Sequence, residues 1–488
     1  MNIDRRKPLT AHVGLLAIGL DTYWEQFPGL LEEMQNKTAV LSQKLAQHQV
    51  TVYDAGMVDN AEKAYQALPK LLAADLDVLF VDMVTYGTSA TFGAIIRAMP
   101  CPVVLVALQP LAAMAYERGT TFMQLCNDDI CSVPEFTGVA IRMGRPVADL
   151  VIGMLQGDEQ ADAAIAEWCR IAHARHDLRN ARLGHLGHVL EAMLDMQTDP
   201  TALTAAFGCH VVQCEPDEIL DEFARLQPTA PEVEAMSRRI LDFFDTPDPV
   251  SDPLTTKLTA ADLLMAARAG AALERFIAKK RLDGLAYYYE AGAETDMRRL
   301  VSNFIVGNSL LTGAGFPMCG EFDLKTCIAM LIMDRLEMGG SFAEFHPIDF
   351  TRDTILIGHD GPHHVNIADR RPVLRSLKKY HGKPGHGAGV EFNIKTGPIT
   401  MLSLGVKGNG QFKFILAEGE SLSHPIPPTG NTNTHGRFQP DLRTFLKRWC
   451  QEGPTHHFAL GVGHHAKTIA KVAKSFGVEA VIVSGKND

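Results

Sequence analysis

Apolar and polar positions along the first part of the chain follow a pattern of alternating strands and helices. An apolar run at 12–20 ends at Asp21, and a helical pattern follows from about 30 to 47. Further apolar runs come at the spacing of an α/β chain, near 50–53, 78–81 and 103–107. Short buried strands separated by helices are typical of a parallel sheet covered on both faces. The pattern predicts a doubly wound, Rossmann- or flavodoxin-like α/β domain over residues 1–160.

The rest of the chain predicts two further domains. The α/β alternation resumes after residue 160 and predicts a second doubly wound α/β domain over 161–325. Beyond it, short alternating segments are broken by Gly, Pro and Asn, at 353–358, 390–395, 398–406 and 411–418. This pattern favours a small antiparallel β-barrel with helices over 326–488. The predicted fold is therefore two α/β domains followed by a C-terminal antiparallel barrel.

Length and charge exclude several classes of partner. The chain has 488 residues and a formal net charge of −11, with no run rich in Lys and Arg. We expect neither a nucleic-acid nor a membrane partner. The nine cysteines form no Cys-x-x-Cys pair, and residues 1–10 are too polar for a signal peptide. Free thiols and the polar start predict a cytoplasmic protein. No Gly-x-Gly-x-x-Gly follows the first strand, so no nucleotide cofactor is indicated.

Four segments in the C-terminal half carry candidate metal ligands. Asp323 can cap the helix predicted over about 323–337, which leaves Glu321 outside that helix and free to point into a cavity. Three further candidates lie in Gly-flanked or aromatic-flanked segments: Glu344, His359 and the pair His464-His465. Carboxylates and imidazoles together suit Mn²⁺, Mg²⁺, Fe²⁺ or Co²⁺ better than a structural zinc. Each residue alone is equally compatible with a surface charge or a loop residue, and the spacings by themselves do not prove that they converge.

The same segments resemble those of the L-arabinose isomerase family, within the L-fucose/L-arabinose isomerase group. Gly320-Glu321-Phe322-Asp323-Leu324-Lys325-Thr326 is similar to that family's Gly-Glu-Gly-Asp-Trp-Lys-Thr. Phe342-Ala343-Glu344-Phe345 is similar to its Phe-Met-Glu-Asp-Tyr, Leu356-Ile357-Gly358-His359 to its apolar run ending in Gly-Ser-His, and Gly461-Val462-Gly463-His464-His465 to its Gly-Gly-Ala-His-His. The resemblance is clearest from about Leu285 onward.

The resemblance implies one divalent-metal site and a sugar substrate. The implied ligands are Glu321, Glu344, His359 and His465, and the implied ion is Mn²⁺, with Mg²⁺, Co²⁺ or Fe²⁺ as alternatives. It further implies a homo-oligomer, a hexamer in the family, and substrate contacts from Asp21, Tyr86 and His464. A metal that polarises a carbonyl and its neighbouring hydroxyl would let Glu321 and Glu344 move a proton between C1 and C2 through an enediol. We therefore expect aldose–ketose isomerisation of a free sugar.

Departures from the family pattern bear on the substrate. The family's Trp and Asp are replaced by Leu324 and Phe345, and an expected Gln and His near 127–131 are replaced by Asn127-Asp128-Asp129-Ile130-Cys131. We therefore expect a sugar other than L-arabinose. Two alternatives stay open: a metal-dependent sugar epimerase or lyase, and a non-catalytic sugar-binding protein on the same fold.

Overall fold

The computed structural model describes residues 3–189, 193–246, 255–256, 258–288, 292, 295–361, 363–377, 379–380, 383–384, 387–427 and 431–484. Its contacts divide the chain into two units. Residues 8–177 form the N-terminal unit, and residues 1–7 join 178–488 in the C-terminal unit. Each unit is described by itself. None of the helices in the described ranges combines the length and apolar character needed to cross a bilayer.

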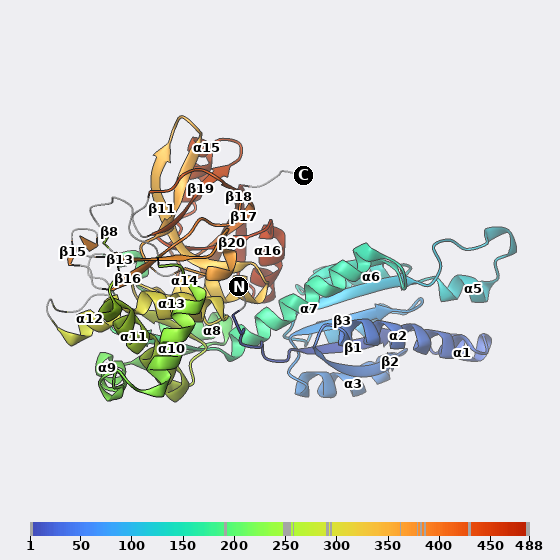
Figure 1. Ribbon diagram of the computed structural model, residues 1–488. Coiled ribbons are helices and arrows are strands. Elements are labelled where there is room, and N and C mark those ends of the chain that lie inside the picture. Colours follow the sequence, from blue (N-terminus) through green and yellow to red (C-terminus); the bar gives the residue numbers. More distant parts are fainter. Residues whose placement is uncertain are drawn as a thin grey trace. The chain divides into compact units, whose positions relative to one another are not determined.

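The N-terminal unit is built on a five-stranded parallel sheet of order β2-β1-β3-β4-β5 (Figure 1). Its strands are β1 (His12–Ile18), β2 (Thr51–Val58), β3 (Val78–Met83), β4 (Val103–Gln109) and β5 (Asp149–Met154). This is the flavodoxin-like order, in which the strands are added in one direction from β1 to β2 and in the opposite direction from β3 onward. β3 is buried along its whole length, as expected of a parallel strand covered on both faces.

The helices of this unit pack on both faces of the sheet or lie beyond the carboxyl ends of its strands (Figure 1). They are α1 (Thr22–Gln26), α2 (Leu30–Ala46), α3 (Ala61–Ala73), α4 (Ser89–Ile96), η1 (Tyr116–Arg118), α5 (Thr121–Cys126), α6 (Val133–Arg142) and α7 (Glu159–Asn180). Leu16 and Ile18 of β1 belong to one apolar core with side chains of α3, α4 and α6. Ala17, between them, belongs to another core with Leu30 and Met34 of α2. Side chains that alternate along a strand thus fill two separate cores.

The C-terminal unit contains a second parallel sheet, of order β10-β9-β6-β7. Its strands are β6 (Arg182–Leu186), β7 (His210–Cys214), β9 (Gly284–Tyr287) and β10 (Met318–Cys319). The accompanying helices are η2 (Leu194–Met196), α8 (Pro200–Phe207), α9 (Pro216–Arg225), α10 (Pro231–Phe243), α11 (Ala260–Lys280), α12 (Asp296–Ser302), α13 (Phe304–Gly313) and α14 (Leu324–Arg335).

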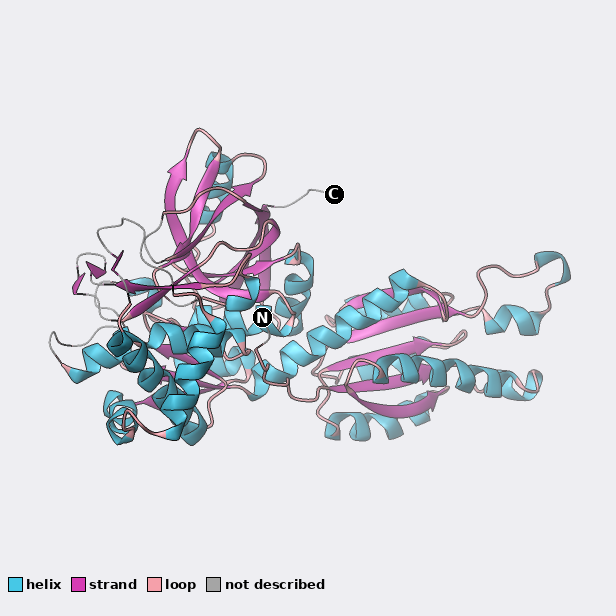
Figure 2. Cartoon of the chain, in the orientation of Figure 1, coloured by secondary structure: helices cyan, strands magenta, loops and turns pink. Residues whose placement is uncertain are grey.

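An antiparallel barrel follows in the same unit, shown as strands in Figure 2. Its strands are β11 (Gly339–Asp349), β12 (Thr354–His359), β17 (Gly397–Val406), β18 (Phe412–Leu422), β19 (Thr432–Phe438) and β20 (Phe458–Val462). They pair in the order β17-β20-β11-β12-β19-β18, and pairing of β18 with β17 closes the barrel. β21 (Glu479–Ser484) adds to β18 in parallel. The mixed fold with two parallel sheets and a closed antiparallel barrel is confirmed.

Shorter elements complete this unit. They are β8 (Thr255–Thr256), η3 (Val365–Ile367), β13 (Val373–Leu377), β14 (Lys379–Tyr380), β15 (Lys383–Pro384), β16 (Ala388–Glu391), α15 (Leu442–Gln451) and α16 (Ala466–Ser475). The second parallel sheet and the barrel fall in one unit by contacts. The division of the chain at residues 160 and 325 therefore stays a prediction.

Helix α14 connects the parallel sheet to the barrel. Every one of its residues is buried, and it packs against β9 and β10 on the one hand and against β11, β17 and β20 on the other. A helix that is covered all round is a core helix with little freedom to move. Its N-terminus therefore gives a fixed position to the side chains that begin it.

Candidate metal centre

The loop between β10 and α14 has an unusual backbone. Glu321 and Phe322 both adopt positive φ, +57° and +64°. Such conformations cost about 1–3 kcal/mol per residue outside glycine and are concentrated at functional sites. Two contacts hold the loop: the Phe322 N–H donates to the Tyr287 carbonyl at 3.0 Å, and Nε2 of His185 lies 3.2 Å from the Phe322 carbonyl oxygen. The loop leaves the Glu321 side chain buried, just ahead of the helix.

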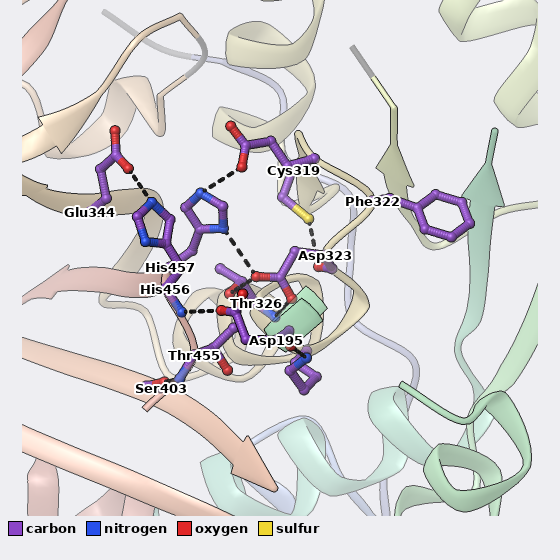
Figure 3. Close-up of polar contacts among 12 residues, drawn as sticks. Asp195, Cys319, Phe322, Asp323, Thr326, Glu344, Ser403, Thr455, His456 and His457 are labelled. Carbon is purple, nitrogen blue, oxygen red and sulfur yellow. Dashed lines mark hydrogen bonds and ion pairs between the residues drawn. The ribbon is translucent and has the colours of Figure 1, made fainter. Parts of the chain in front are cut away.

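Asp323 caps α14, as the sequence predicts. Its Oδ1 accepts a hydrogen bond from the Thr326 N–H at 3.0 Å, and its Oδ2 accepts one from the Thr326 hydroxyl at 2.7 Å. The same Oδ2 lies 3.2 Å from Nδ1 of His457 (Figure 3). Asp323 therefore fixes the start of the helix and a histidine of the barrel at the same time.

Three ligand atoms come together beside this cap. Glu321, His359 and His457 each offer one atom, and these atoms lie within 4.8 Å of one another. Oε2 of Glu321 is 3.2 Å from Nε2 of His457, and Oε1 of Glu321 is 3.9 Å from Nε2 of His359. Within the described ranges, Nε2 of His359 is buried without a hydrogen-bond partner, and Oε2 of Glu321 and Nε2 of His457 are buried with only their 3.2 Å ion-pair contact to each other. Buried polar atoms left unpaired cost about 1–3 kcal/mol each, so this cluster favours a bound cation.

The far nitrogens of both imidazoles are occupied. Nδ1 of His457 contacts the Asp323 carboxylate, and Nδ1 of His359 lies 3.0 Å from the Asp360 carbonyl oxygen. In a neutral imidazole whose Nδ1 donates its hydrogen to such an acceptor, Nε2 keeps the lone pair that a metal requires, and a cation bound here would take the place of a proton on Nε2 of His457. The Phe342 ring packs against both imidazoles, with centroid distances of 4.4 Å to His359 and 4.3 Å to His457. These contacts hold both rings in an orientation suited to metal binding.

Glu344, on β11, belongs to a second group of ligand atoms. This group consists of Glu344, His456 and His457, so His457 is shared with the first. Oε2 of Glu344 lies 2.6 Å from Nε2 of His456 (Figure 3), and Oε1 lies 3.9 Å from Nε2 of His346. The His456 side chain is 48% exposed, whereas His457 has no exposed surface. The centre therefore has a buried part around Glu321 and a part at Glu344 that water can reach.

Electrostatics within the cluster favour ionised carboxylates. Burial by itself would raise the pKa of Glu321, but its contact with His457 and the charges of His457 and His359 hold that pKa below its usual value. For Glu344 the contact with His456 and the neighbouring imidazoles outweigh burial and lower the pKa to about 2. Burial would lower the pKa of His457, but Asp323 and Glu321 raise it to about 9. The buried carboxylates thus require a positive charge beside them.

The segment that carries His456 and His457 is itself well anchored. The His456 N–H donates to Oδ2 of Asp195 at 2.8 Å, and the Thr455 N–H donates to the Ser403 hydroxyl at 2.9 Å (Figure 3). The segment leads directly into β20 of the barrel. The donor set is two carboxylates and two or three imidazoles, which fits Mn²⁺, Fe²⁺ or Co²⁺.

Comparisons with known proteins show which families this chain is similar to. The model of the L-fucose isomerase C-terminal domain matches residues 346–484. An L-arabinose isomerase of Shewanella sp. (strain MR-4) is 25% identical over 71% of this chain and 68% of its own length. One from Aeromonas hydrophila is 24% identical over the same shares, and L-arabinose isomerase 1 of Bacillus licheniformis is 27% identical over 36% of each chain. This chain is similar in sequence to L-arabinose isomerases, and its C-terminal part is similar to that of L-fucose isomerase. The resemblance seen in the sequence is thereby confirmed.

His465 does not belong to either group of ligand atoms that the described residues form. His465 begins α16, and its N–H donates to the Thr400 hydroxyl at 3.0 Å. Nε2 of His464 lies 3.0 Å from the Gly419 carbonyl oxygen, and the residue is exposed. The choice of His465 as a ligand is corrected to His457, and the position of His464 gives its expected substrate contact no support.

The reason for the difference is the strand between the two histidine pairs. His456-His457 precedes β20 and His464-His465 follows it. A five-residue strand at about 3.3 Å per residue separates its two ends by roughly 16 Å, so only one pair can reach the centre. Both pairs lie close after a glycine beside the same apolar run. A glycine pattern alone therefore cannot distinguish them. The segment Gly453-Pro454-Thr455-His456-His457 shows the same pattern, so the sequence offered His457 as a candidate ligand as well.

The predicted substrate residues Asp21 and Tyr86 lie in the N-terminal unit. Asp21 follows β1, and its Oδ2 accepts a hydrogen bond from the Asn60 side chain at 3.0 Å. Tyr86 follows β3 and is half-buried. Both residues therefore stand beyond the carboxyl ends of the two strands between which the sheet order reverses, where doubly wound folds bind ligands. Their role in sugar binding stays a prediction.

Proposed function

We propose that this protein is a divalent-metal-dependent isomerase that converts a free aldose to the corresponding ketose. The observation that supports it most directly is the set of buried ligand atoms on Glu321, His359 and His457, which face one another, with both imidazoles held through their far nitrogens. Glu344 is the fourth ligand in this proposal, and Mn²⁺ is the ion we expect first. The sugar isomerases among the relatives give the reaction type.

A cation in this centre would polarise the sugar carbonyl and the hydroxyl beside it and so acidify the intervening C–H bond. Glu321 and Glu344 supply the proton transfers in our proposal. Both carboxylates have a lowered pKa, so each is ionised, and acidification of the C–H bond by the cation would have to make up for their weak basicity. One carboxylate takes the proton from C2 while a proton reaches O1, which gives the enediol; the O2 hydroxyl then gives up its proton as a proton is delivered to C1, which gives the ketose. No hydride donor is needed.

The Glu344–His456 pair gives the proposed reaction a proton path to solvent. The two side chains are 2.6 Å apart, and His456 is half exposed. A proton accepted by Glu344 can therefore pass to the imidazole and exchange with water. Glu321 has no such exposed neighbour among the contacts described above. Of the two carboxylates, Glu344 is therefore the one that can exchange its proton with water.

We propose that the substrate is a sugar other than L-arabinose. Where the family has an Asp, Phe345 packs its ring against Phe458 and Trp449, with centroid distances of 4.9 and 6.2 Å. Leu324 is fully buried in α14. In the N-terminal unit, Asp129 forms a buried ion pair of 2.5 Å with Lys37. These side chains serve packing and ion pairing, so a substrate whose hydroxyls need the family's polar residues would lose those contacts.

The assembly and the N-terminal contacts belong to the same proposal. A homo-oligomer, and sugar contacts from Asp21 and Tyr86, are carried over from the family resemblance. Size determination in solution tests the first. Substitution of Tyr86 by Phe tests the second, and we expect a higher KM for the sugar with unchanged Mn²⁺ binding.

The test is ketose formation by the purified full chain from a panel of aldoses, with and without Mn²⁺. We expect Mn²⁺-dependent ketose from at least one pentose, hexose or deoxy sugar and little from L-arabinose. Glu321→Gln should lower the rate at least about 100-fold, because it removes a charged ligand and a proton acceptor. The matched control is Glu337→Gln, an exposed carboxylate just beyond α14, which should leave the rate unchanged.

The same assay separates the proposal from the alternatives. An epimerase would give a second aldose, and a lyase would give two smaller carbonyl compounds. A sugar-binding protein would show saturable binding and no product. Sugar binding that Glu321→Gln leaves intact, with no turnover on any aldose, would overturn the proposed reaction.

A further inference from the structure

Two histidines beside the proposed ligand His359 have no place in the chemistry described so far. His363 and His364 are both buried, and neither belongs to a group of metal ligands among the described residues. Nε2 of His363 lies 2.8 Å from the carbonyl oxygen of His359, and Nδ1 of His363 lies 3.2 Å from the Ser341 hydroxyl. The Ser341 hydroxyl in turn accepts a hydrogen bond from the His364 N–H at 3.2 Å. A chain of contacts therefore begins at a metal ligand.

This series of contacts continues to Arg5, near the start of the sequence. Nε2 of His364 lies 3.1 Å from Oδ1 of Asp334, whose side chain is 3% exposed. Oδ2 of Asp334 accepts a hydrogen bond from Nη2 of Arg5 at 2.8 Å. Arg335 also donates to Asp334, at 2.5 Å. The chain thus links Arg5 to His359 through Asp334, His364, Ser341 and His363.

The chemistry of the atoms gives each hydrogen bond a direction. A carbonyl oxygen can only accept, so Nε2 of His363 carries a hydrogen and donates it to His359. Nδ1 of a neutral His363 then has a free lone pair, which accepts the Ser341 hydroxyl hydrogen. The Asp334 carboxylate likewise can only accept, so Nε2 of His364 donates to it. His364 contacts Asp334 through its ring and Ser341 through its backbone N–H, so the network fixes positions and does not pass protons.

The series of contacts ends at Arg5, which lies on a short N-terminal arm, defined here as residues Ile3–Lys7. The arm belongs to the C-terminal unit although it precedes the N-terminal one. Ile3 is buried in the core of that unit, and the Arg6 N–H donates to the Ala314 carbonyl at 2.8 Å. The Arg6 side chain contacts the Leu282 carbonyl and the Phe316 ring. Arg6 therefore anchors the same arm without touching the chain that leads to His359.

We propose that these contacts form a positioning relay, in which His363 holds the backbone of His359 and the arm residue Arg5 strengthens that hold. The inference rests on the proposed function, because His359 must be a metal ligand. The His359 ring is oriented by the Asp360 carbonyl, one residue along, so a shift of the His359 backbone moves its Nε2 directly. Metal sites tolerate little such displacement. The relay thus makes the affinity for the cation depend on the contact of the arm residue Arg5 with Asp334.

The experiment measures Mn²⁺ affinity of the full chain by the electron paramagnetic resonance signal of free Mn²⁺. We expect His363→Leu to weaken Mn²⁺ binding about 10-fold. His363→Gln, which keeps a donor and an acceptor of similar reach, should restore most of the affinity. Arg5→Gln, at a half-exposed residue outside the centre, should weaken binding about threefold. Arg6→Gln is the matched control and should leave the Mn²⁺ affinity unchanged.

A double variant tests the connection itself. If Arg5 acts through His363, adding Arg5→Gln to His363→Leu should weaken binding no further, because neighbouring members of one network are not additive. Equal Mn²⁺ affinity of wild type, Arg5→Gln and His363→Leu would overturn the relay while leaving the metal centre intact. Loss of affinity in His363→Gln equal to that in His363→Leu, or an independent effect of Arg5→Gln in the double variant, would also overturn it. If wild type bound no Mn²⁺, the metal centre and the relay would both be wrong. The same would follow if wild type and Glu321→Gln bound Mn²⁺ with equal affinity.

Discussion

Oδ2 of Asp323 lies 3.2 Å from Nδ1 of His457, and neither side chain has any exposed surface. The first residue caps a helix that packs on a parallel sheet, and the second precedes a barrel strand. Their contact is the point at which the two parts of the C-terminal unit fix one imidazole. Carboxylate–histidine pairs of this kind orient metal ligands and raise their basicity.

Asp323→Asn separates the two roles of this residue. Asparagine caps a helix as well as aspartate does, so the hydrogen bond to the Thr326 N–H can persist. The negative charge beside His457 is lost, and we expect Mn²⁺ affinity to fall about 10- to 100-fold. Thr326→Val, which removes only the hydroxyl partner, is the control and should lower stability with little change in affinity. Calorimetric titration with Mn²⁺ measures the difference, and an unchanged affinity in Asp323→Asn would contradict the assigned role.

Paired substitutions distinguish the two histidine pairs. His457→Gln should abolish measurable Mn²⁺ binding, because it removes a buried ligand and leaves Glu321 and Asp323 without their partner. His465→Gln, beyond the other end of β20, should bind Mn²⁺ as wild type does. The reverse result would restore the assignment first made from the sequence. Equilibrium dialysis of both variants at one metal concentration is sufficient.

Metal binding should stabilise one unit selectively. A ligand at 100 times its Kd stabilises the state that binds it by about 2.7 kcal/mol. All the proposed ligands lie in the C-terminal unit, so Mn²⁺ should slow hydrogen exchange in peptides of α14, β11 and β20. Peptides from the N-terminal sheet serve as the internal reference, and a chelator should reverse the effect. Equal protection in both units would argue against a site confined to the C-terminal one.

Asp82 should make the stability of the N-terminal unit depend on pH. Burial raises the pKa of this carboxyl to about 7, although Lys37 and a 2.9 Å hydrogen bond from Thr38 oppose the rise. Between about pH 4 and 7 the folded protein therefore holds a proton that the unfolded chain has released. Stability then falls as pH rises through this window, by about 4 kcal/mol at most.

Asp82→Asn should remove that decline, since the amide has no proton to lose. Hydrogen exchange of β3 peptides, compared between variant and wild type at pH 4.5 and pH 7.5, measures it. The variant should gain protection relative to wild type at the higher pH more than at the lower one. Asp162→Asn, half-exposed on α7, is the control. A constant difference across both pH values would contradict the assignment.

The sequence by itself determined the local elements and indicated candidate residues for the chemistry. Alternating apolar blocks predicted the parallel sheet of the N-terminal unit because its inner strands β1, β3 and β4 are buried on both faces, and short Gly-broken segments predicted the barrel. The cap at Asp323 was also readable, since it depends only on residues up to Thr326. Glu321, Glu344 and His359 could be named because they stand in short motifs whose residue types suit a metal.

Tertiary structure decided which residues meet. His457 and His465 follow similar local patterns, and only the direction and length of β20 place the first at the centre and the second at the opposite end. The contacts of Asp323 with His457, and of Arg5 with Asp334, join residues 134 and 329 positions apart. Local periodicity contains no information on such pairs, because they form only when a buried helix, a parallel sheet and a closed barrel pack against one another.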